Sequence, residues 1–328
     1  MRFTAFLGLA LLALGACSQQ SAPTTTGRTQ IRFVTDWVAQ AEQGGFYEAL
    51  AEGEYAKRGL DVRIIQGGSS VNVPELIAAG QVEMGDGSNS FIAMNLANQH
   101  VPVEAVAAFM QKDPQVLLAH PDAGINALAD IKGHPVLISD ASRTAFWPWL
   151  KAKYGYSDDQ VRSYDFTNGP FIQDKRAVQE GYVTSEPYTI GKAGGFAPKV
   201  FLLADQGYPS YAAMVLASTK FIVANPAAVK AFVEASAIGW RDYLHGDPRP
   251  ADALIMKDDP DMKPDVLAQA RDKMRQYGLV DGGDAGTLGI GAMTDQHWLD
   301  FFTIASPSGT ANYKNAFTLQ FLPNPPVK

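Results

Sequence analysis

The sequence predicts an α/β protein with two lobes, each built around a mostly parallel β-sheet covered by helices. Two observations lead to this expectation. Strand-like and helix-like segments alternate up to Met110 and alternate again after Pro114, which is the pattern of parallel sheets with helical crossovers. Roughly 300 residues follow the N-terminal segment, and a chain of that size divides into two cores more readily than it fills one.

Hydrophobic periodicity predicts each element of the first lobe. Period-2 alternation or short apolar runs predict strands, and apolar residues at helical spacing predict helices. Gly59 and Gly80 each follow a helix-like run, as C-terminal cap glycines do. The expected strands cover residues 30–34, 60–65, 81–84 and 103–110, and the expected helices cover residues 46–57, 73–79 and 91–98.

A second alternating unit begins after Asp113 and Pro114. One of its predicted helices contains Pro148, which we expect to kink that helix because proline cannot donate the helical hydrogen bond. The expected strands of this unit cover residues 116–119, 135–138, 161–166, 181–184 and 200–203, and its expected helices cover residues 127–131, 144–154 and 174–179.

After this unit the chain is expected to return to the first lobe. Residues 211–217 form a long apolar run that we place as a strand in the first sheet. Amphipathic helices that buttress this lobe are expected at residues 226–243, 264–277 and 295–305. The first lobe is therefore expected over residues 30–112 together with 211–328, and the second lobe over residues 113–210.

The N-terminal segment predicts export and lipid attachment. The apolar run over residues 6–13 follows a basic start and is too short to span a membrane, which requires about 20 apolar residues. It ends in Leu14-Gly15-Ala16-Cys17, which resembles the lipobox of bacterial lipoproteins. This resemblance implies a signal peptide over residues 1–16 and a diacylglycerol on Cys17, and residues 17–29 have the polar composition of a flexible tether. The alternative is ordinary signal cleavage beside an incidental cysteine.

Composition and missing motifs argue against several classes of function. The net charge of −7 and the absence of a basic cluster disfavour a nucleic-acid partner. The sequence has no phosphate-binding P-loop, nucleophile elbow, zinc-protease motif or dinucleotide-binding motif. Its five histidines lack metal-ligand spacing, and Cys17 is the only cysteine. We therefore expect no metal, no cofactor and no enzymatic activity.

Polar and aromatic residues gather in loops that follow the predicted strands, where α/β sheets bind ligands. Asp36 beside Trp37 suits a flat ring that carries N–H donors, by hydrogen bonding and stacking. Capped helix N-termini also present unpaired N–H groups to a ligand. The candidate ligand-binding residues are Asp36, Trp37, Gly68, Ser69, Ser88, Asn89, Ser142, Arg143, Thr144, Glu186 and Tyr188.

Each candidate also has a purely structural interpretation. Ser88, Ser142 and Thr144 can serve only as helix caps, and the Gly67-Gly68 pair can be only a turn. Trp37 can be an ordinary packing residue. Of Trp147 and Trp149, one is expected in the core and the other is a candidate for the ligand site; the sequence does not choose between them.

An ordered set of short segments resembles the SsuA/THI5-like (NMT1/THI5) substrate-binding proteins of ABC transporters. The segments are Asp36-Trp37, Gly45-Phe46-Tyr47, the stretch GEYAKRGLDV over residues 53–62, LIAAGQVEMG over residues 76–85 and LADIKG over residues 128–133. The resemblance implies a type II periplasmic-binding-protein fold, with a ligand cleft between two lobes that close about a hinge. It also implies a small-molecule ligand delivered to an ABC permease, on the periplasmic side of the cytoplasmic membrane. We expect a monomer.

Within that class, Asp36-Trp37 resembles the members that bind pyrimidine precursors of thiamine. We therefore expect a small planar N-heteroaromatic ligand, of the thiamine-pyrimidine or flavin-precursor type. Asp36 and Glu186 would accept its N–H groups, and Trp37 or Tyr188 would stack on its ring. Further polar contacts would come from Ser88, Asn89 and the Ser142-Arg143-Thr144 turn. Those members continue with proline, asparagine and histidine, whereas this sequence has VAQAEQ over residues 38–43.

Two alternatives stay open. The first keeps the fold but binds a small anion such as an aliphatic sulfonate, taurine or nitrate. The capped helix N-termini and Arg143 support an anion, and Asp36 and Glu186 oppose it. The second, more remote alternative is a THI5-like pyrimidine synthase. That enzyme uses a histidine, a lysine for pyridoxal phosphate and a cysteine cluster, which a single cysteine at position 17 does not supply.

Overall fold

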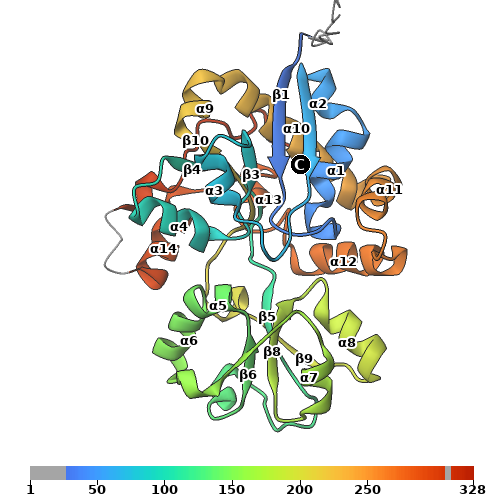
Figure 1. The fold of residues 1–328 in the computed structure, drawn as a ribbon, viewed down its shortest axis with the longest axis vertical. Helices are drawn as coiled ribbons and strands as arrows, with labels where there is room; N and C mark the ends of the chain where they lie inside the picture. The colour runs from blue at the N-terminus through green and yellow to red at the C-terminus, as the bar shows by residue number, and fades with distance from the viewer. Residues whose placement is uncertain (1–26, 307–311) are drawn as a thin grey trace, which may run out of the picture.

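A computed structural model describes residues 27–306 and 312–328 of the chain. Figure 1 shows two lobes arranged along the long axis of the molecule. The predicted signal peptide, the lipid site at Cys17 and most of the tether lie outside the described residues. Within the described part of the chain, no helix is long and apolar enough to cross a membrane.

The first lobe, at the top of Figure 1, contains a five-stranded sheet with the order β2-β1-β3-β10-β4. β1 pairs in parallel with β2 and β3, whereas β10 runs antiparallel between β3 and β4. The strands are β1 (Thr29–Val34), β2 (Leu60–Ile65), β3 (Met84–Asp86), β4 (Val103–Met110) and β10 (Ala212–Ser218). The segment predicted to return from the second lobe is therefore β10, and the sheet is mixed because this strand opposes the others.

The second lobe repeats this plan in a sheet with the order β7-β6-β8-β5-β9. β6 pairs in parallel with β7 and β8, whereas β5 runs antiparallel between β8 and β9. The strands are β5 (Gln115–Ala119), β6 (Val136–Ile138), β7 (Val161–Ser163), β8 (Val178–Tyr182) and β9 (Lys199–Leu202). In each lobe, the antiparallel strand is the one whose chain arrives from the other lobe.

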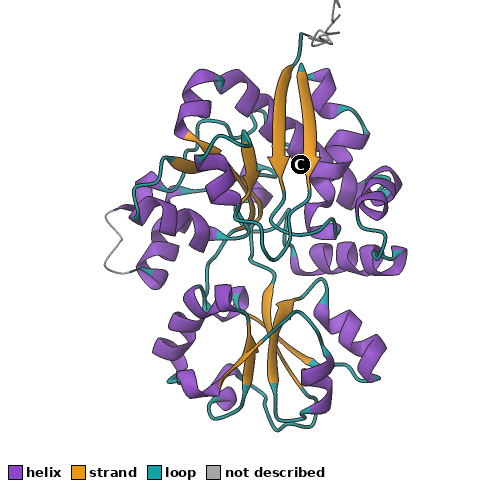
Figure 2. Cartoon of the chain, in the orientation of Figure 1, coloured by secondary structure: helices purple, strands orange, loops and turns teal. Residues whose placement is uncertain are grey.

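Helices flank the sheet of the first lobe on both sides (Figure 2). The helix predicted over residues 46–57 is divided into two, because Gly53 adopts a left-handed conformation with φ +72° between them. The helical segments are η1 (Ala41–Gln43), α1 (Gly44–Ala51), α2 (Glu54–Lys57), α3 (Val73–Ala78), α4 (Ser90–Asn98), α9 (Thr219–Ala224), α10 (Pro226–His245), α11 (Arg249–Asp258), α12 (Pro264–Tyr277), α13 (Ala285–Leu288) and α14 (Asp295–Ala305). Two of these, α12 and α14, have the bounds expected from the sequence.

The helices of the second lobe differ more from expectation. Pro148 does not kink a helix; it lies in the first turn of α6, where its missing N–H costs nothing. The helix predicted over residues 174–179 was wrong, because Val178 and Gln179 pair with β5 and β6 as part of β8. The helical segments are η2 (Leu128–Ile131), α5 (Asp140–Thr144), α6 (Trp147–Tyr154), η3 (Asp158–Gln160), α7 (Gly169–Gln173), α8 (Glu186–Gly194) and η4 (Ala204–Gln206).

The first sheet separates two apolar clusters, because neighbouring side chains of a strand point to opposite faces. In β1, Phe33 belongs to one buried cluster with Trp240, and Val34 belongs to another with Trp298. Because both faces of the sheet are covered, a ligand can approach it only at the strand ends that face the other lobe. The loops after β1 and β3 lie at that end, and they carry the candidate site residues of the first lobe.

Candidate ligand-binding site

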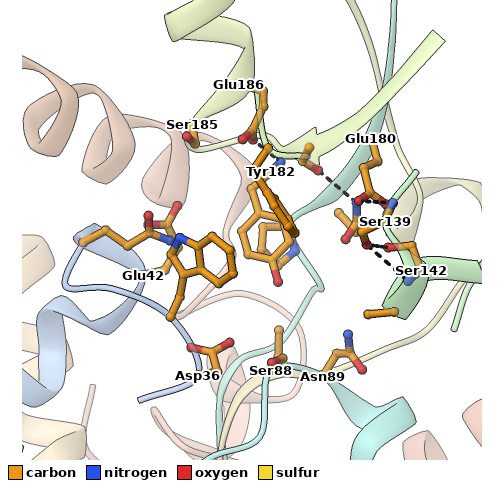
Figure 3. Close-up of a pocket in the computed structure, with 18 of the residues that line it drawn as sticks. Asp36, Glu42, Ser88, Asn89, Ser139, Ser142, Glu180, Tyr182, Ser185 and Glu186 are labelled. Atoms are coloured by element: carbon orange, nitrogen blue, oxygen red, sulfur yellow. Dashed lines mark hydrogen bonds between the residues drawn. The ribbon is translucent and has the colours of Figure 1, made fainter. Parts of the chain in front are cut away.

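A cavity of about 490 Å³ lies between the two lobes, and we call it the interlobe cavity. Figure 3 shows side chains from both lobes converging on it. Its polar and aromatic lining residues include Asp36, Trp37, Gln40, Glu42, Gln43, Asp86, Ser88, Asn89, Gln115, Ser139, Ser142, Tyr164, Phe166, Asn168, Glu180, Tyr182, Ser185, Glu186 and Thr189. The cavity is therefore rich in hydrogen-bond acceptors and has a partly aromatic wall.

The loop after β1 is held in place by side-chain hydrogen bonds. The Thr35 hydroxyl donates to the Trp37 carbonyl oxygen (2.7 Å) and accepts from the Gly67 N–H (3.0 Å). The side-chain amide of Gln43 donates to Asp36 Oδ1 over 3.1 Å. Burial raises the pKa of the Asp36 carboxyl, and hydrogen bonds from Ser88 and Gln43 partly offset this. A ligand N–H donor would stabilise the ionised form of this carboxyl.

Asp86, at the end of β3, is the second acid of the first lobe. It is only 2% exposed, and no described residue offers a hydrogen bond to its Oδ1 atom. Burial raises its pKa well above the ordinary range, and the nearby carboxyl of Asp36 adds to the shift. A buried acceptor without a partner is costly. A ligand group that hydrogen-bonds to Asp86 would offset this cost, because the ionised carboxyl accepts and the protonated carboxyl also donates.

The second lobe supplies a matching acceptor, Glu180, on β8. Its Oε1 accepts from the Ser139 backbone N–H over 2.8 Å, while its Oε2 has no partner among the described residues. Burial raises the pKa of Glu180, and hydrogen bonds from Ser142 and Ser139 oppose the shift. Ser139 caps α5 by accepting from the Ser142 N–H. The cap thus fixes the serines beside Glu180 (Figure 3).

Two further glutamates lie where the lobes approach each other. Glu42, in η1, accepts a hydrogen bond from the Thr184 hydroxyl of the second lobe, and burial raises its pKa. Glu186 accepts from the Tyr182 backbone N–H over 2.6 Å. Burial raises the pKa of Glu186 to about 7. Both lobes therefore direct carboxyl groups toward the same space.

Aromatic side chains form another part of the wall. The Trp37 ring lies 4.8 Å from the Phe166 ring, measured between centroids, and Phe166 lies 5.2 Å from Tyr164. Phe166 is 49% exposed and adopts φ +63°, a strained conformation for a bulky residue. Tyr182 extends into the middle of the site in Figure 3. These rings offer apolar faces on which a flat ligand can stack.

The lining of the interlobe cavity contains acidic residues but no basic ones among the described residues. Among the described residues that line it there is no lysine, arginine or histidine. The acids that line it are Asp36, Glu42, Asp86, Glu180 and Glu186. Such a lining offers no positive charge to a small anion, whereas its carboxyl groups can accept hydrogen bonds from N–H donors. In the described part of the chain, no group of three or more His, Cys, Asp or Glu is arranged to hold a metal ion.

The structure brings six of the predicted residues together and leaves five outside. Those that line the interlobe cavity are Asp36, Trp37, Ser88, Asn89, Ser142 and Glu186, whereas Gly68, Ser69, Arg143, Thr144 and Tyr188 do not. Arg143 and Thr144 point away from the cavity that Ser142 lines because all three residues lie in α5, where successive side chains are rotated by about 100°. Arg143 pairs instead with Asp140 over 3.3 Å on the surface. The helix cap expected at Ser88 is Asn89, whose Oδ1 accepts from the Phe91 N–H.

Tyr188, which we expected to stack on the ligand, does not line the interlobe cavity. It lies two residues after Glu186 in α8, so the two side chains leave the helix on opposite sides. Its hydroxyl donates to Asp265 Oδ2 of α12 over 2.6 Å, which is a contact between the lobes.

One of Trp147 and Trp149 was a candidate for the ligand site. Both are buried in the core, and neither lines the interlobe cavity.

Sequence reasoning missed several residues of the interlobe cavity. Glu42, Tyr164, Phe166 and Asn168 come from segments without a recognisable loop motif. Tyr182 was placed in a strand predicted over residues 181–184, but Glu180 fell between that strand and the helix predicted over residues 174–179, so the sequence did not connect the two. Two positions apart on a strand, they share one face, so recognition of β8 would have paired them.

Comparison with known proteins places this arrangement in a family. The profile of the NMT1/THI5-like family matches residues 40–251. The chain belongs to the NMT1/THI5-like family. The resemblance inferred from short segments is thus confirmed, and those segments include the Gly45-Phe46-Tyr47 start of α1 and the end of α3.

This NMT1/THI5-like protein is similar to binding proteins of known name. It is 24% identical to the riboflavin-binding protein RibY of Chloroflexus aurantiacus over 323 residues, 94% of this chain and 91% of that protein. It is 25% identical to the formylaminopyrimidine-binding protein of Halalkalibacterium halodurans over 245 residues, 73% and 71% of the two chains. These relatives support a substrate-binding role.

Its fold is that of the periplasmic binding proteins. The solved structure of a periplasmic sulfonate-binding protein, SsuA from Methylobacillus flagellatus, superposes with a TM-score of 0.62 at 14% identity, covering 90% of this chain and 93% of that one. At this identity the likeness shows the fold alone. The two-lobe α/β architecture expected from the sequence is confirmed.

Proposed function

We propose that this NMT1/THI5-like protein is the substrate-binding component of an ABC importer and captures a small planar N-heteroaromatic, of the thiamine-pyrimidine or flavin-precursor type. The observation that carries the proposal is the set of carboxyl groups that line the interlobe cavity without a basic partner. Five acids line it, no basic residue among the described lining residues balances them, and aromatic rings lie beside them.

The acceptors match the edge of an N-heteroaromatic ring. Asp36 and Asp86 come from the first lobe and Glu180 from the second, so N–H groups on opposite edges of one ligand can reach both lobes. Each hydrogen bond to a carboxylate satisfies an acceptor whose burial is otherwise unfavourable. A ligand with donors on two sides therefore stabilises the closed arrangement of the lobes.

The aromatic wall supports a flat ligand rather than an aliphatic one. Trp37, Phe166 and Tyr182 line the interlobe cavity and come from both lobes. Ring faces stack on planar heterocycles, while the carboxyl groups take up the polar ring edge. The names of the two relatives, which bind riboflavin and formylaminopyrimidine, agree with this chemistry.

The anion alternative lacks the residue that an anion needs. Arg143, the cation on which that alternative depended, does not line the interlobe cavity and pairs with Asp140. A sulfonate or nitrate would meet carboxyl groups from both lobes. An enzymatic role is also not proposed, because the similar proteins are named for binding and Cys17 supplies no cysteine cluster.

We further propose that the protein is a monomer anchored by a lipid on Cys17, outside the cytoplasmic membrane, with lobes over residues 30–112 with 211–328 and 113–210. The lipobox-like Leu14-Gly15-Ala16-Cys17 supports the anchor. Expressed in a bacterium fed radiolabelled palmitate, the full chain should become labelled and sediment with membranes. Cys17→Ser should abolish labelling, and label that persists in this variant would contradict the anchor.

Isothermal titration of the full chain in detergent tests the ligand class. The panel is riboflavin, formylaminopyrimidine, taurine and nitrate, each titrated under the same buffer. We expect saturable binding of at least one heterocycle and none of the anions. Binding of taurine or nitrate without heterocycle binding would overturn the proposal.

A further inference from the structure

A second hollow of about 300 Å³, which we call the side pocket, adjoins the interlobe cavity in the first lobe. Three residues line both: Asp36, Asp86 and Ser88. The rest of the side-pocket wall comes mainly from residues 69–74, in the loop after β2 and the start of α3. A ligand held by Asp36 or Asp86 is therefore within reach of the side pocket.

One wall of the side pocket is rich in unpaired donors. Ser69 and Ser70 are exposed, and neither their hydroxyls nor their backbone N–H groups hydrogen-bond to another residue in 27–306 or 312–328. The Asn72 Oδ1 caps α3 by accepting from the Glu75 N–H. No described residue accepts from the Asn72 side-chain NH₂ group. This loop can therefore donate several hydrogen bonds to acceptor atoms of a ligand.

The other parts of the side pocket are apolar or acidic. Val73 is buried at the wall, and Ile92 of α4 is half-buried there. At the junction with the interlobe cavity stands Asp86, 2% exposed, whose Oδ1 has no partner among the described residues. The side pocket thus offers donors, one deep acceptor and an apolar surface within a short distance.

On the basis of the proposed function, we propose that the ligand's ring carries a flexible, uncharged, hydroxylated carbon chain, and that this chain occupies the side pocket. A hydroxyl both donates and accepts, so it can pair with Asp86 and also with Ser69 or Ser70. The carbon backbone of such a chain can cover Val73 and Ile92. The hydroxyl groups of a polyol chain would face the polar wall of the side pocket, and its carbon atoms would face the apolar wall.

A negatively charged chain does not fit this site. Asp36 and Asp86 stand at its junction with the interlobe cavity, and no basic residue is among the described residues that line the side pocket. A phosphate at the end of the chain would lose water without gaining a positive partner. The side pocket therefore selects for a neutral hydroxylated chain over its phosphorylated form.

Three flavins separate these features in a titration of the full chain. Riboflavin carries the hydroxylated chain, lumichrome has the ring without it, and flavin mononucleotide adds a phosphate. We expect riboflavin to bind at least tenfold more tightly than lumichrome and more tightly than flavin mononucleotide. Ser69→Phe should fill the side pocket and reduce riboflavin affinity to the lumichrome value, without changing lumichrome binding.

The matched control is Ser163→Phe, which changes an exposed serine on β7 that lines neither hollow. It should leave all three affinities unchanged, and thermal melts should show that both variants are folded. If Ser69→Phe misfolds, Ser70→Leu blocks the same pocket with a smaller side chain. Both variants should spare lumichrome binding.

Several results would overturn the inference, and they differ from failure of the proposed function. Equal affinities for riboflavin and lumichrome, or formylaminopyrimidine binding without flavin binding, would remove the side-pocket role and leave a heterocycle-binding protein. Flavin mononucleotide binding as tightly as riboflavin would contradict the neutral chain. Binding of anions alone would overturn the proposed function, and the side-pocket inference with it.

Discussion

The indole of Trp37 lies 4.8 Å from the ring of Phe166, with the ring planes inclined by 49°, and this contact joins the first lobe to the second. Both residues line the interlobe cavity, and Phe166 has the strained φ of +63°. The second lobe therefore keeps a large exposed ring at the site against its backbone preference. The pair is positioned to exchange its mutual contact for a contact with a flat ligand.

Trp37→Ala should weaken heterocycle binding by about tenfold or more, ~1.4 kcal/mol, because the ligand loses a stacking surface. Isothermal titration measures the change. Tyr277→Ala, at the end of α12 and outside the interlobe cavity, removes a half-buried aromatic ring as a control. Unchanged affinity in Trp37→Ala would show that this ring does not stack on the ligand.

Stability of the ligand-free protein should fall as pH rises from about 4.5 toward 7. Burial raises the pKa of Glu186 to about 7, whereas the pKa of a glutamate in the unfolded chain is ~4.3. The folded state then binds more protons than the unfolded state in this window, so raising the pH favours unfolding. The stabilisation is complete below the unfolded pKa and is lost as pH passes through the folded pKa.

Thermal melts between pH 5 and pH 8 test this titration. Glu186→Gln should reduce the slope of this pH dependence, because an amide does not ionise. Glu75→Gln, which changes an exposed glutamate in the first turn of α3, serves as the matched control and should keep the wild-type slope. A Glu186→Gln variant with the full wild-type slope would assign the effect to other groups.

Asp265→Ala should speed ligand release without lowering the melting temperature. Asp265 accepts from the Tyr188 hydroxyl (2.6 Å) and pairs with Lys192 over 2.7 Å, so α12 of the first lobe holds α8 of the second. These groups are exposed, and exposed pairs contribute little to folding. We expect an increase of about two- to five-fold in the dissociation rate, measured by stopped-flow fluorescence.

The control for that experiment is Asp272→Ala on the same helix, whose carboxylate pairs with Arg275 within α12. It removes the same charge without touching the second lobe. Equal release rates in the two variants would mean that the contact between α8 and α12 does not hold the lobes together.

Gly239→Ala should destabilise the fold by ~1–3 kcal/mol, because a methyl group there overpacks the contact between α10 and α1. A Cβ at this position would lie 2.2 Å from the Gly45 carbonyl oxygen. Gly286→Ala is the control, since its Cβ would meet no atom closer than 3.6 Å. Urea unfolding measures both, and equal stability of the two variants would refute the close approach of these helices.

The sequence by itself determined the elements whose periodicity is strong and the loops that follow them. The strand over residues 103–110 and the helices α12 and α14 have the expected bounds. Asp36, Ser88 and Asn89 line one cavity because the parallel strands β1 and β3 end at the same edge of the sheet. Such local patterns depend on neighbouring residues, which the sequence displays directly.

Only the tertiary structure decided which side chains face the ligand. Glu186 lines the interlobe cavity while Tyr188, two residues later, contacts Asp265 of α12 instead. That outcome depends on the rotation of α8 and on a partner 77 residues away in the chain. Likewise, Asp86 and Glu180 become neighbours of one cavity only when two separate sheets pack with their strand ends facing each other. The directions of these side chains and the distance between the lobes are set by long-range packing, which a local sequence pattern does not predict.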